Sequence, residues 1–425
     1  MLRRFASLPS PCPRSLYRPI LSNLRRSFTS DIKVDELQLT LPFLEANFPH
    51  RWLRDSCQCP SCVHPSTLQK LHRSSDIPAD IRPASGGLVL RSEGVHVRWS
   101  DGHESFYTFS FLERHSSPSN LATFHKVVEK TPWDASSISK VSDLYIAYDD
   151  LSKPSRFLSA INQLSHVGLL FITSVPTDKT DDEICEVRKL ADTFGVLLPT
   201  FYGETWDVRN VRNSRNIAYT NLDLGLHMDL LYFQHPPRYQ ILHCLRNRVA
   251  GGKSIFVDGF HAASVLQETY PADFDILATT PVPFHYINDS HHLHYEHQTI
   301  ELEVPSPADA SKSSQQPIKH INYSPPFQAP LLLNSTPPSF YTALGRFAAL
   351  LDKPANRVEY LLREGDAVVF DNRRVLHARM AFTDTAGSDT ARVGETNRWL
   401  KGCYFEADSM LDRGRVLSEK LQKTM

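Results

Sequence analysis

The stretch Gly225-Leu226-His227-Met228-Asp229 places an imidazole and a carboxylate two residues apart, and the fold has to present both at one site. On a β-strand, residues i and i+2 project from the same face, so both side chains point into one space. A second imidazole comes much later, at His377, shortly after an apolar strand that ends at Phe370. The sequence therefore predicts a β-rich core that brings distant metal-binding side chains together.

Two histidines and one carboxylate on one face of a metal leave positions open, as in the non-haem iron(II) oxygenases. The His-x-Asp spacing alone is weak evidence, since nineteen histidines produce such spacings by chance. The interpretation gains from Arg398, because a guanidinium makes two parallel hydrogen bonds to the carboxylate of a dicarboxylic cosubstrate. We predict that His227, Asp229 and His377 are the catalytic iron ligands and that Arg398 binds the cosubstrate.

The composition excludes several other classes of protein. With 425 residues, the chain is long enough for a main domain and at least one smaller unit. Its formal net charge of −1 provides no basic field for nucleic acid. No apolar run approaches the roughly 20 residues that cross a bilayer, so we expect neither nucleic acid nor a membrane span.

The first thirty residues differ from the rest. They contain six arginines and six serines, and no acidic residue precedes Asp31. This composition is typical of a mitochondrial transit peptide, so we expect residues 1–30 to be a leader and the protein to reside in the mitochondrial matrix. A disordered basic tail on a cytoplasmic protein is the alternative.

Hydrophobic patterning divides the remaining chain into a β-rich module at 31–116, a linker at 117–148 and a catalytic domain at 149–425. The predicted strands are 37–41, 87–90, 95–99, 239–245, 254–257, 319–323 and 366–370, and the predicted helices are 149–164, 181–194 and 338–352. Residues 306–316 are polar and low in complexity, which predicts a surface insertion. Many strands with a few covering helices indicate a mainly β fold with flanking helices.

Several further motifs carry a resemblance to a known family. They are Phe201-Tyr202-Gly203-Glu204-Thr205-Trp206, Ala218-Tyr219-Thr220, Leu242-His243-Cys244-Leu245, Gly251-Gly252-Lys253-Ser254, Val257-Asp258-Gly259-Phe260, Phe370-Asp371-Asn372 and Arg398 to Tyr404. With the His-x-Asp segment, they resemble the γ-butyrobetaine and trimethyllysine dioxygenases of carnitine biosynthesis. The resemblance implies a double-stranded β-helix, or jelly-roll, core. It also implies Fe(II), 2-oxoglutarate and ascorbate, with Ser254 assisting Arg398.

The resemblance also places substrate-binding residues. Tyr202, Trp206, Tyr219 and Tyr404 match an aromatic cage for a trimethylammonium group, which cation–π attraction recognises. Taken without the resemblance, aromatic residues at this density favour core packing. Of two asparagines expected at the substrate carboxylate, one matches Asn216 and the other position holds Ser324. This departure, and a long interval between His377 and Arg398, leave the substrate open.

Three cysteines crowd into Cys57-x-Cys59-x2-Cys62, which supplies three thiolates for a tetrahedral zinc ion. An odd total of seven cysteines argues against a disulfide framework. The resemblance places the fourth ligand at His103, after the Asp101-Gly102 turn, whereas His64 is so close to Cys62 that closing the tetrahedron strains the chain. We expect a structural zinc site, because four protein ligands leave no open position.

The leading functional hypothesis is therefore hydroxylation of γ-butyrobetaine to carnitine. Hydroxylation of trimethyllysine is its rival, favoured by the leader. A catalytically silent binder of quaternary amines is a third possibility, which the complete His/Asp/His set disfavours. The resemblance further implies a homodimer.

Overall fold

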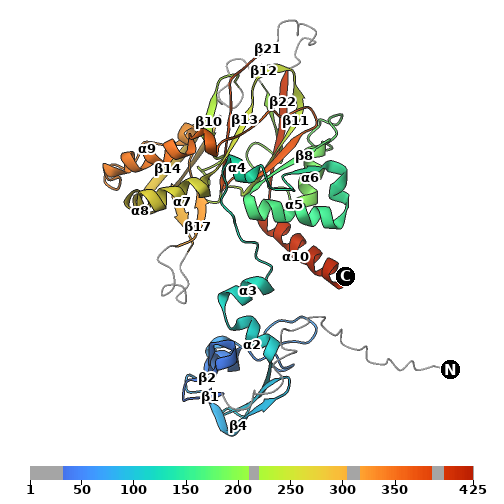
Figure 1. The fold of residues 1–425 in the computed structure, drawn as a ribbon, viewed down its shortest axis with the longest axis vertical. Coiled ribbons are helices and arrows are strands. Elements are labelled where there is room, and N and C mark those ends of the chain that lie inside the picture. The colour runs from blue at the N-terminus through green and yellow to red at the C-terminus, as the bar shows by residue number, and fades with distance from the viewer. Residues whose placement is uncertain (1–31, 210–219, 304–315, 385–396, 425) are drawn as a thin grey trace, which may run out of the picture. The chain divides into compact units, whose positions relative to one another are not determined.

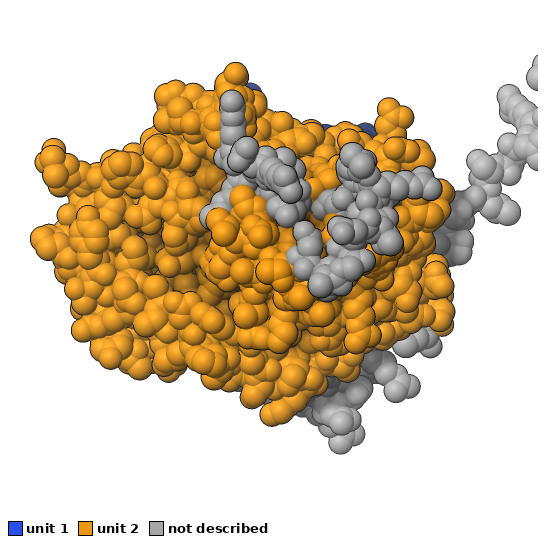
Figure 2. Space-filling view, turned by 90° about the horizontal axis from the view of Figure 1, so that it is seen from above, with its two compact units in different colours: residues 1–127 blue, residues 128–425 orange. Residues whose placement is uncertain are grey.

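The computed structural model describes residues 32–209, 220–303, 316–384 and 397–424. The chain divides into two compact units, residues 1–127 and 128–425, which are drawn in blue and orange in Figure 2. The predicted leader, Asn216, Tyr219 and most of the predicted 306–316 insertion lie outside the described residues. The predicted domain boundaries at 116 and 149 stay predictions.

Unit 1 consists of two three-stranded antiparallel sheets and short helices (Figure 1). The strands are β1 (Lys33–Val34), β2 (Gln38–Leu41), β3 (Ala46–Pro49), β4 (Pro83–Arg91), β5 (Gly94–Trp99) and β6 (Glu104–Thr108). The helices are α1 (His50–Asp55), α2 (Phe109–His115) and α3 (Pro118–Phe124). Alternate residues of β5 and β6, such as Val95, Val97 and Tyr107, are fully buried in one apolar cluster. The predicted β-rich N-terminal module is confirmed.

Unit 2 is built on a six-stranded and a four-stranded sheet. The six-stranded sheet has the order β7 (Tyr145–Ala147), β8 (Leu169–Thr173), β19 (Ala367–Asp371), β11 (Tyr239–Asn247), β22 (Arg398–Phe405) and β9 (Thr205–Arg209). The four-stranded sheet has the order β10 (Leu224–His227), β20 (Val375–Arg379), β13 (Ser254–Asp258) and β18 (Val358–Tyr360). Three two-stranded ribbons add β12 (Val249–Gly251) with β21 (Phe382–Asp384), β14 (Pro281–Asn288) with β15 (His291–Gln298), and β16 (Ile300–Leu302) with β17 (Ile318–Ile321).

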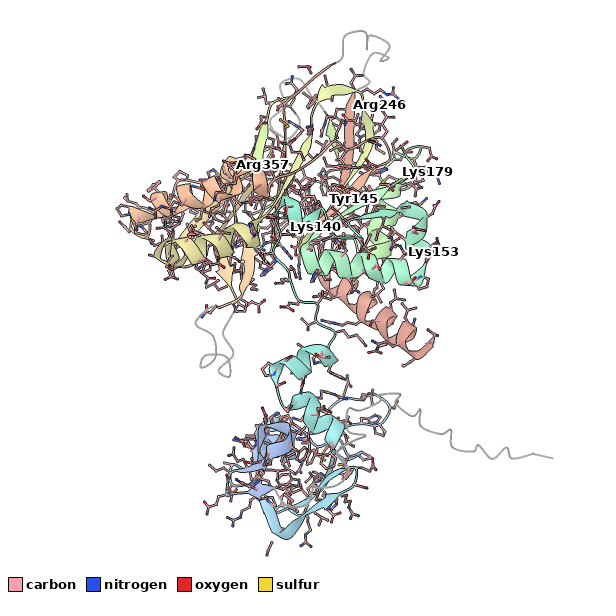
Figure 3. The ribbon with its side chains drawn as sticks, in the orientation of Figure 1. Lys140, Tyr145, Lys153, Lys179, Arg246 and Arg357 are labelled. Atoms are coloured by element: carbon pink, nitrogen blue, oxygen red, sulfur yellow. The ribbon has the colours of Figure 1, made fainter. Side chains whose placement is uncertain are left out.

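An apolar cluster joins side chains from both sheets of unit 2. Phe171 and Phe370 of the six-stranded sheet pack with Phe256 of the four-stranded sheet, with ring centroids 5.7 and 5.8 Å from Phe256. Tyr145, labelled in Figure 3, lies on β7 at the edge of the six-stranded sheet, and its ring stacks on that of Phe171. This arrangement is the jelly-roll core that the sequence predicts.

Helices cover the outer surfaces of unit 2. They are α4 (Ala135–Ile138), α5 (Pro154–Val167), α6 (Glu186–Phe194), α7 (Gly259–Thr269), α8 (Pro271–Thr279), α9 (Ser339–Leu351) and α10 (Ala407–Thr424). Helices α5, α6 and α10 pack on the six-stranded sheet, whereas α7, α8 and α9 pack together beside the four-stranded sheet (Figure 1). Among the described residues, no helix is long and apolar enough to span a membrane.

Two predicted helix starts are wrong. The helix predicted at 149–164 is divided into a 3₁₀ turn, Tyr148–Ser152, and α5, because Pro154 takes the first position of a new helix and Lys153 is extended before it. The helix predicted from Asp181 begins only at Glu186. Cys185 stands in the extended conformation at its N-cap, so residues before it are turns.

Candidate active site

Strands β10 and β20 bring the predicted iron ligands together, because His227 and His377 are directly paired across the antiparallel ladder. Their ring centroids lie 4.2 Å apart. Asp229 follows β10, and its two carboxylate oxygens lie 3.5 Å from Nε2 of His227 and 3.7 Å from Nε2 of His377. Three side chains from two distant parts of the sequence thus converge at one point.

The donor atoms suit a single metal ion. Metal–ligand bonds of about 2.1 Å at right angles place neighbouring ligand atoms roughly 3 Å apart, close to the separations found. Burial, and then the neighbouring His227, lower the pKa of His377 to about 3, so its imidazole is neutral as a metal ligand requires. Three protein donors leave positions for further ligands.

The carboxylate of Asp229 is held by neighbouring side chains. Gln240 Nε2 donates to its Oδ2 at 2.8 Å, and the Tyr404 hydroxyl donates to the same oxygen at 3.3 Å. The buried amide of Asn372 bonds both the backbone N–H and the C=O of Asp229. Burial alone would raise the pKa of Asp229, but the interactions with the two imidazoles hold it well below its ordinary value.

A pocket opens on these residues, and both predicted cosubstrate-binding residues line it. Arg398, at the start of β22, and Ser254, at the start of β13, are 4% and 7% exposed. Burial, and then the nearby Arg379, lower the pKa of Arg398 to about 10, so the guanidinium remains charged at neutral pH. A buried cation and a hydroxyl that line the same pocket offer the hydrogen-bond donors that a carboxylate ligand needs.

Three of the four predicted cage residues line the same pocket: Tyr202, Trp206 and Tyr404. The rings of Trp206 and Tyr404 stack with centroids 4.3 Å apart, and the indole lies directly over Gly402 on the paired strand. Tyr219 and Asn216 lie outside the described residues. Ser324 is buried, but it is not among the described residues that line the pocket.

Five polar or aromatic residues of the pocket were not predicted from the sequence: Tyr232, Gln240, Phe256, Phe327 and Arg379. The hydroxyl of Tyr232 lies 3.4 Å from that of Tyr202, and its ring packs 5.3 Å from Phe327. The only hint in the sequence was that Tyr232 lies three residues after Asp229. Leu230, between Asp229 and Tyr232, has φ +62°, and a leucine does not predict this left-handed backbone conformation.

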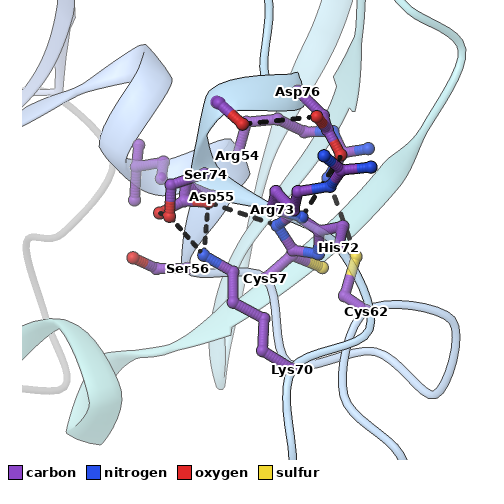
Figure 4. Close-up of polar contacts among 12 residues, drawn as sticks. Arg54, Asp55, Ser56, Cys57, Cys62, Lys70, His72, Arg73, Ser74 and Asp76 are labelled. Atoms are coloured by element: carbon purple, nitrogen blue, oxygen red, sulfur yellow. Dashed lines mark hydrogen bonds and ion pairs between the residues drawn. The ribbon is translucent and has the colours of Figure 1, made fainter.

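The predicted zinc ligands also come together, in unit 1. Nε2 of His103 lies 3.4 Å from Sγ of Cys57 and 3.5 Å from Sγ of both Cys59 and Cys62. A tetrahedral zinc ion with bonds of about 2.3 Å to sulfur and 2.0–2.1 Å to nitrogen separates these atoms by about 3.5 Å. Arg54 donates to Sγ of Cys62 at 3.6 Å, as Figure 4 shows, so the cluster has a cationic neighbour.

The known proteins to which the chain is similar agree with this geometry. Residues 137–404 match the model of the taurine catabolism dioxygenase TauD, TfdA family, which is more than half of the chain. The chain belongs to the TauD/TfdA dioxygenase family. Residues 32–113 match the N-terminal domain of γ-butyrobetaine hydroxylase-like proteins. This TauD/TfdA member is therefore an iron- and 2-oxoglutarate-dependent dioxygenase.

Individual relatives cover most of the chain. Dioxygenase str8 of Strobilurus tenacellus is 54% identical, over 88% of this chain and 86% of the relative. A γ-butyrobetaine dioxygenase of Pseudomonas sp. is 31% identical, over 87% of this chain and 90% of the relative. The mitochondrial trimethyllysine dioxygenase of Homo sapiens is 26% identical, over 90% of this chain and 86% of the relative. The predicted resemblance to the γ-butyrobetaine and trimethyllysine dioxygenases is confirmed.

Proposed function

We propose that this dioxygenase hydroxylates a small trimethylammonium compound, with γ-butyrobetaine as the first candidate and carnitine as its product. The observation that carries the proposal is the wall of aromatic rings, Tyr202, Trp206, Tyr232, Phe327 and Tyr404, in the same pocket as the predicted iron ligands. A trimethylammonium group has no N–H to donate, and ring faces attract it by about 0.5 to 2 kcal/mol each.

In this proposal His227, Asp229 and His377 hold Fe(II), and Arg398 with Ser254 binds the distal carboxylate of 2-oxoglutarate. The bound iron and cosubstrate supply the oxidising chemistry, with succinate and CO₂ as the by-products. The protein's contribution is to orient the substrate carbon toward the metal and to exclude water. Gln240 and Asn372 keep the carboxylate of Asp229 aimed at the metal.

Trimethyllysine is the rival substrate. Relatives of both kinds match the chain over similar lengths, and the leader-like composition of residues 1–30 favours a mitochondrial enzyme. Ser324 stands where the resemblance calls for an asparagine and is not among the described residues that line the pocket, so it gives γ-butyrobetaine no support over trimethyllysine. A binder without turnover is the third alternative, and the complete set of iron-binding side chains opposes it.

The remaining parts of the proposal are less central to the reaction. Cys57, Cys59, Cys62 and His103 hold a structural zinc ion, supported by their distances. Ascorbate keeps the iron reduced. The enzyme works in the mitochondrial matrix, with the cytoplasm as the alternative. Two copies of the chain form a homodimer.

The test is a substrate panel. The purified protein is incubated with Fe(II), ascorbate and 2-oxoglutarate, together with γ-butyrobetaine, trimethyllysine or an uncharged isostere in which carbon replaces nitrogen. Succinate and the hydroxylated product are measured, and His227→Ala is the control for metal-dependent turnover. Product from γ-butyrobetaine supports the proposal, and product from trimethyllysine alone supports the rival. Equal turnover of the uncharged isostere would remove the trimethylammonium assignment, and tight binding without succinate would identify the silent binder.

A further inference from the structure

Arg379, the last residue of β20, lies two positions after His377 and is 7% exposed. Its side chain lines the active-site pocket beside Arg398. One of its terminal nitrogens, Nη2, donates to two backbone carbonyl oxygens, those of Thr220 and Leu222, each at 2.7 Å. The two acceptors lie four and two residues before Leu224, where β10, the strand that presents His227, begins.

Strand β10 has weak support from its own sheet. It is the edge of the four-stranded sheet, and β20 is its neighbour there. Across this ladder Leu224 pairs with Arg379 and His227 pairs with His377, and the register shifts between the two pairs. A short edge strand with an interrupted ladder is held by few backbone hydrogen bonds, so side-chain bonds contribute much of its placement.

The two ends of this ligand-bearing segment are fixed by one neighbouring stretch of chain. Asn372 bonds both backbone groups of Asp229 at the downstream end. Arg379 bonds the carbonyls of Thr220 and Leu222 at the upstream end. His377 lies between these two residues in the sequence. The stretch that supplies one imidazole therefore also holds the backbone that supplies the other imidazole and the carboxylate.

We propose that Arg379 is a positioning residue that fixes β10 against β20 and so sets the distance between His227 and His377. It acts through the backbone that leads into β10 and does not itself bind the metal. A guanidinium suits the task because its fan of N–H donors reaches two carbonyls at once, whereas a lysine ammonium offers a compact point charge. The inference concerns the assembly of the metal site and holds whichever substrate the enzyme takes.

The test uses the full-length protein with Fe(II) alone and needs no prime substrate. Amide hydrogen exchange of residues 220–229 and anaerobic Fe(II) affinity are measured in Arg379→Met and Arg379→Lys. Loss of two hydrogen bonds from a charged donor should speed exchange in this segment by at least about tenfold. Fe(II) affinity should fall by about tenfold, as is usual when a residue that orients a metal ligand is removed. Exchange in α5 and α9 should not change.

Arg248→Met is the matched control, because this arginine is 62% exposed in its ion pair with Glu364 and is not among the described residues that line the pocket. Faster exchange and weaker Fe(II) binding in Arg379→Met, with only partial recovery in Arg379→Lys, support the proposal. If Arg379→Lys shows the hydrogen exchange and the Fe(II) affinity of the wild type, a positive charge alone suffices and the proposal is wrong. If Arg379→Met does not fold, the lysine variant decides the question by itself.

Discussion

The two candidate metal sites are assembled in opposite ways. In unit 1, Cys57, Cys59 and Cys62 come from one short loop, and only His103 comes from elsewhere. In unit 2, His227 and Asp229 meet a ligand that is well over a hundred residues distant in the sequence. Four donors close the first site, whereas three leave the second open. The comparison indicates that a local cluster serves stability, while an open site needs a whole fold to hold it.

The largest expected effect is on the open site. His377→Ala removes one of three iron donors, so turnover with 2-oxoglutarate should fall by more than about a hundredfold, beyond the usual loss for a residue that merely orients a ligand. Zinc content should remain that of the wild type. Succinate formation and metal content per chain are measured together. Turnover within tenfold of the wild type would contradict the assignment of His377.

The second expected effect is on the closed site. Cys62→Ser should remove zinc and lower the thermal stability of unit 1, because four-ligand zinc sites contribute directly to folding. Unfolding is followed by hydrogen exchange in β5 and β6, and Fe(II) affinity is the control. Unchanged zinc content, or unchanged exchange in these strands, would show that the cluster is not a structural zinc site.

The two sites also differ in how far the sequence alone predicts them. The cysteine cluster and the His-x-Asp pair are visible because their members are neighbours in the chain. The residues that hold Asp229 are not visible, since Asn372 reaches it only through the register of the folded strands. Tyr232 depends on the positive φ of Leu230. Strand type follows from local hydrophobic alternation, but pocket walls follow from long-range packing, which one sequence does not reveal.

The third expected effect concerns the support of the open site. Gln240→Leu removes the 2.8 Å hydrogen bond to Asp229 and leaves a side chain of similar volume. Fe(II) affinity should fall by about tenfold, because the carboxylate loses one of the donors that orient it. Gln163→Leu, which removes a buried glutamine bond in α5 far along the chain from the pocket residues, is the matched control. An affinity equal in the two variants would show that Gln240 does not support the iron site.

The smallest expected effect is on the aromatic wall, and it separates substrate binding from metal binding. Trp206→Ala should weaken binding of a trimethylammonium substrate by about twofold to fivefold, the loss of one cation–π contact of about 0.5 to 1 kcal/mol at a ring that is only partly buried. Gly402→Ala offers a gentler displacement, since its new Cβ would lie 2.7 Å from the indole ring atoms and push that ring from its place. Both variants should retain wild-type Fe(II) affinity, because neither side chain bonds a ligand of the metal.

If Trp206→Ala leaves the KM for the trimethylammonium substrate unchanged while the iron site stays intact, the ring is part of the core packing and the cage interpretation is wrong. The open site would then owe its selectivity to other aromatic residues that line the pocket, Tyr202, Tyr232 and Phe327.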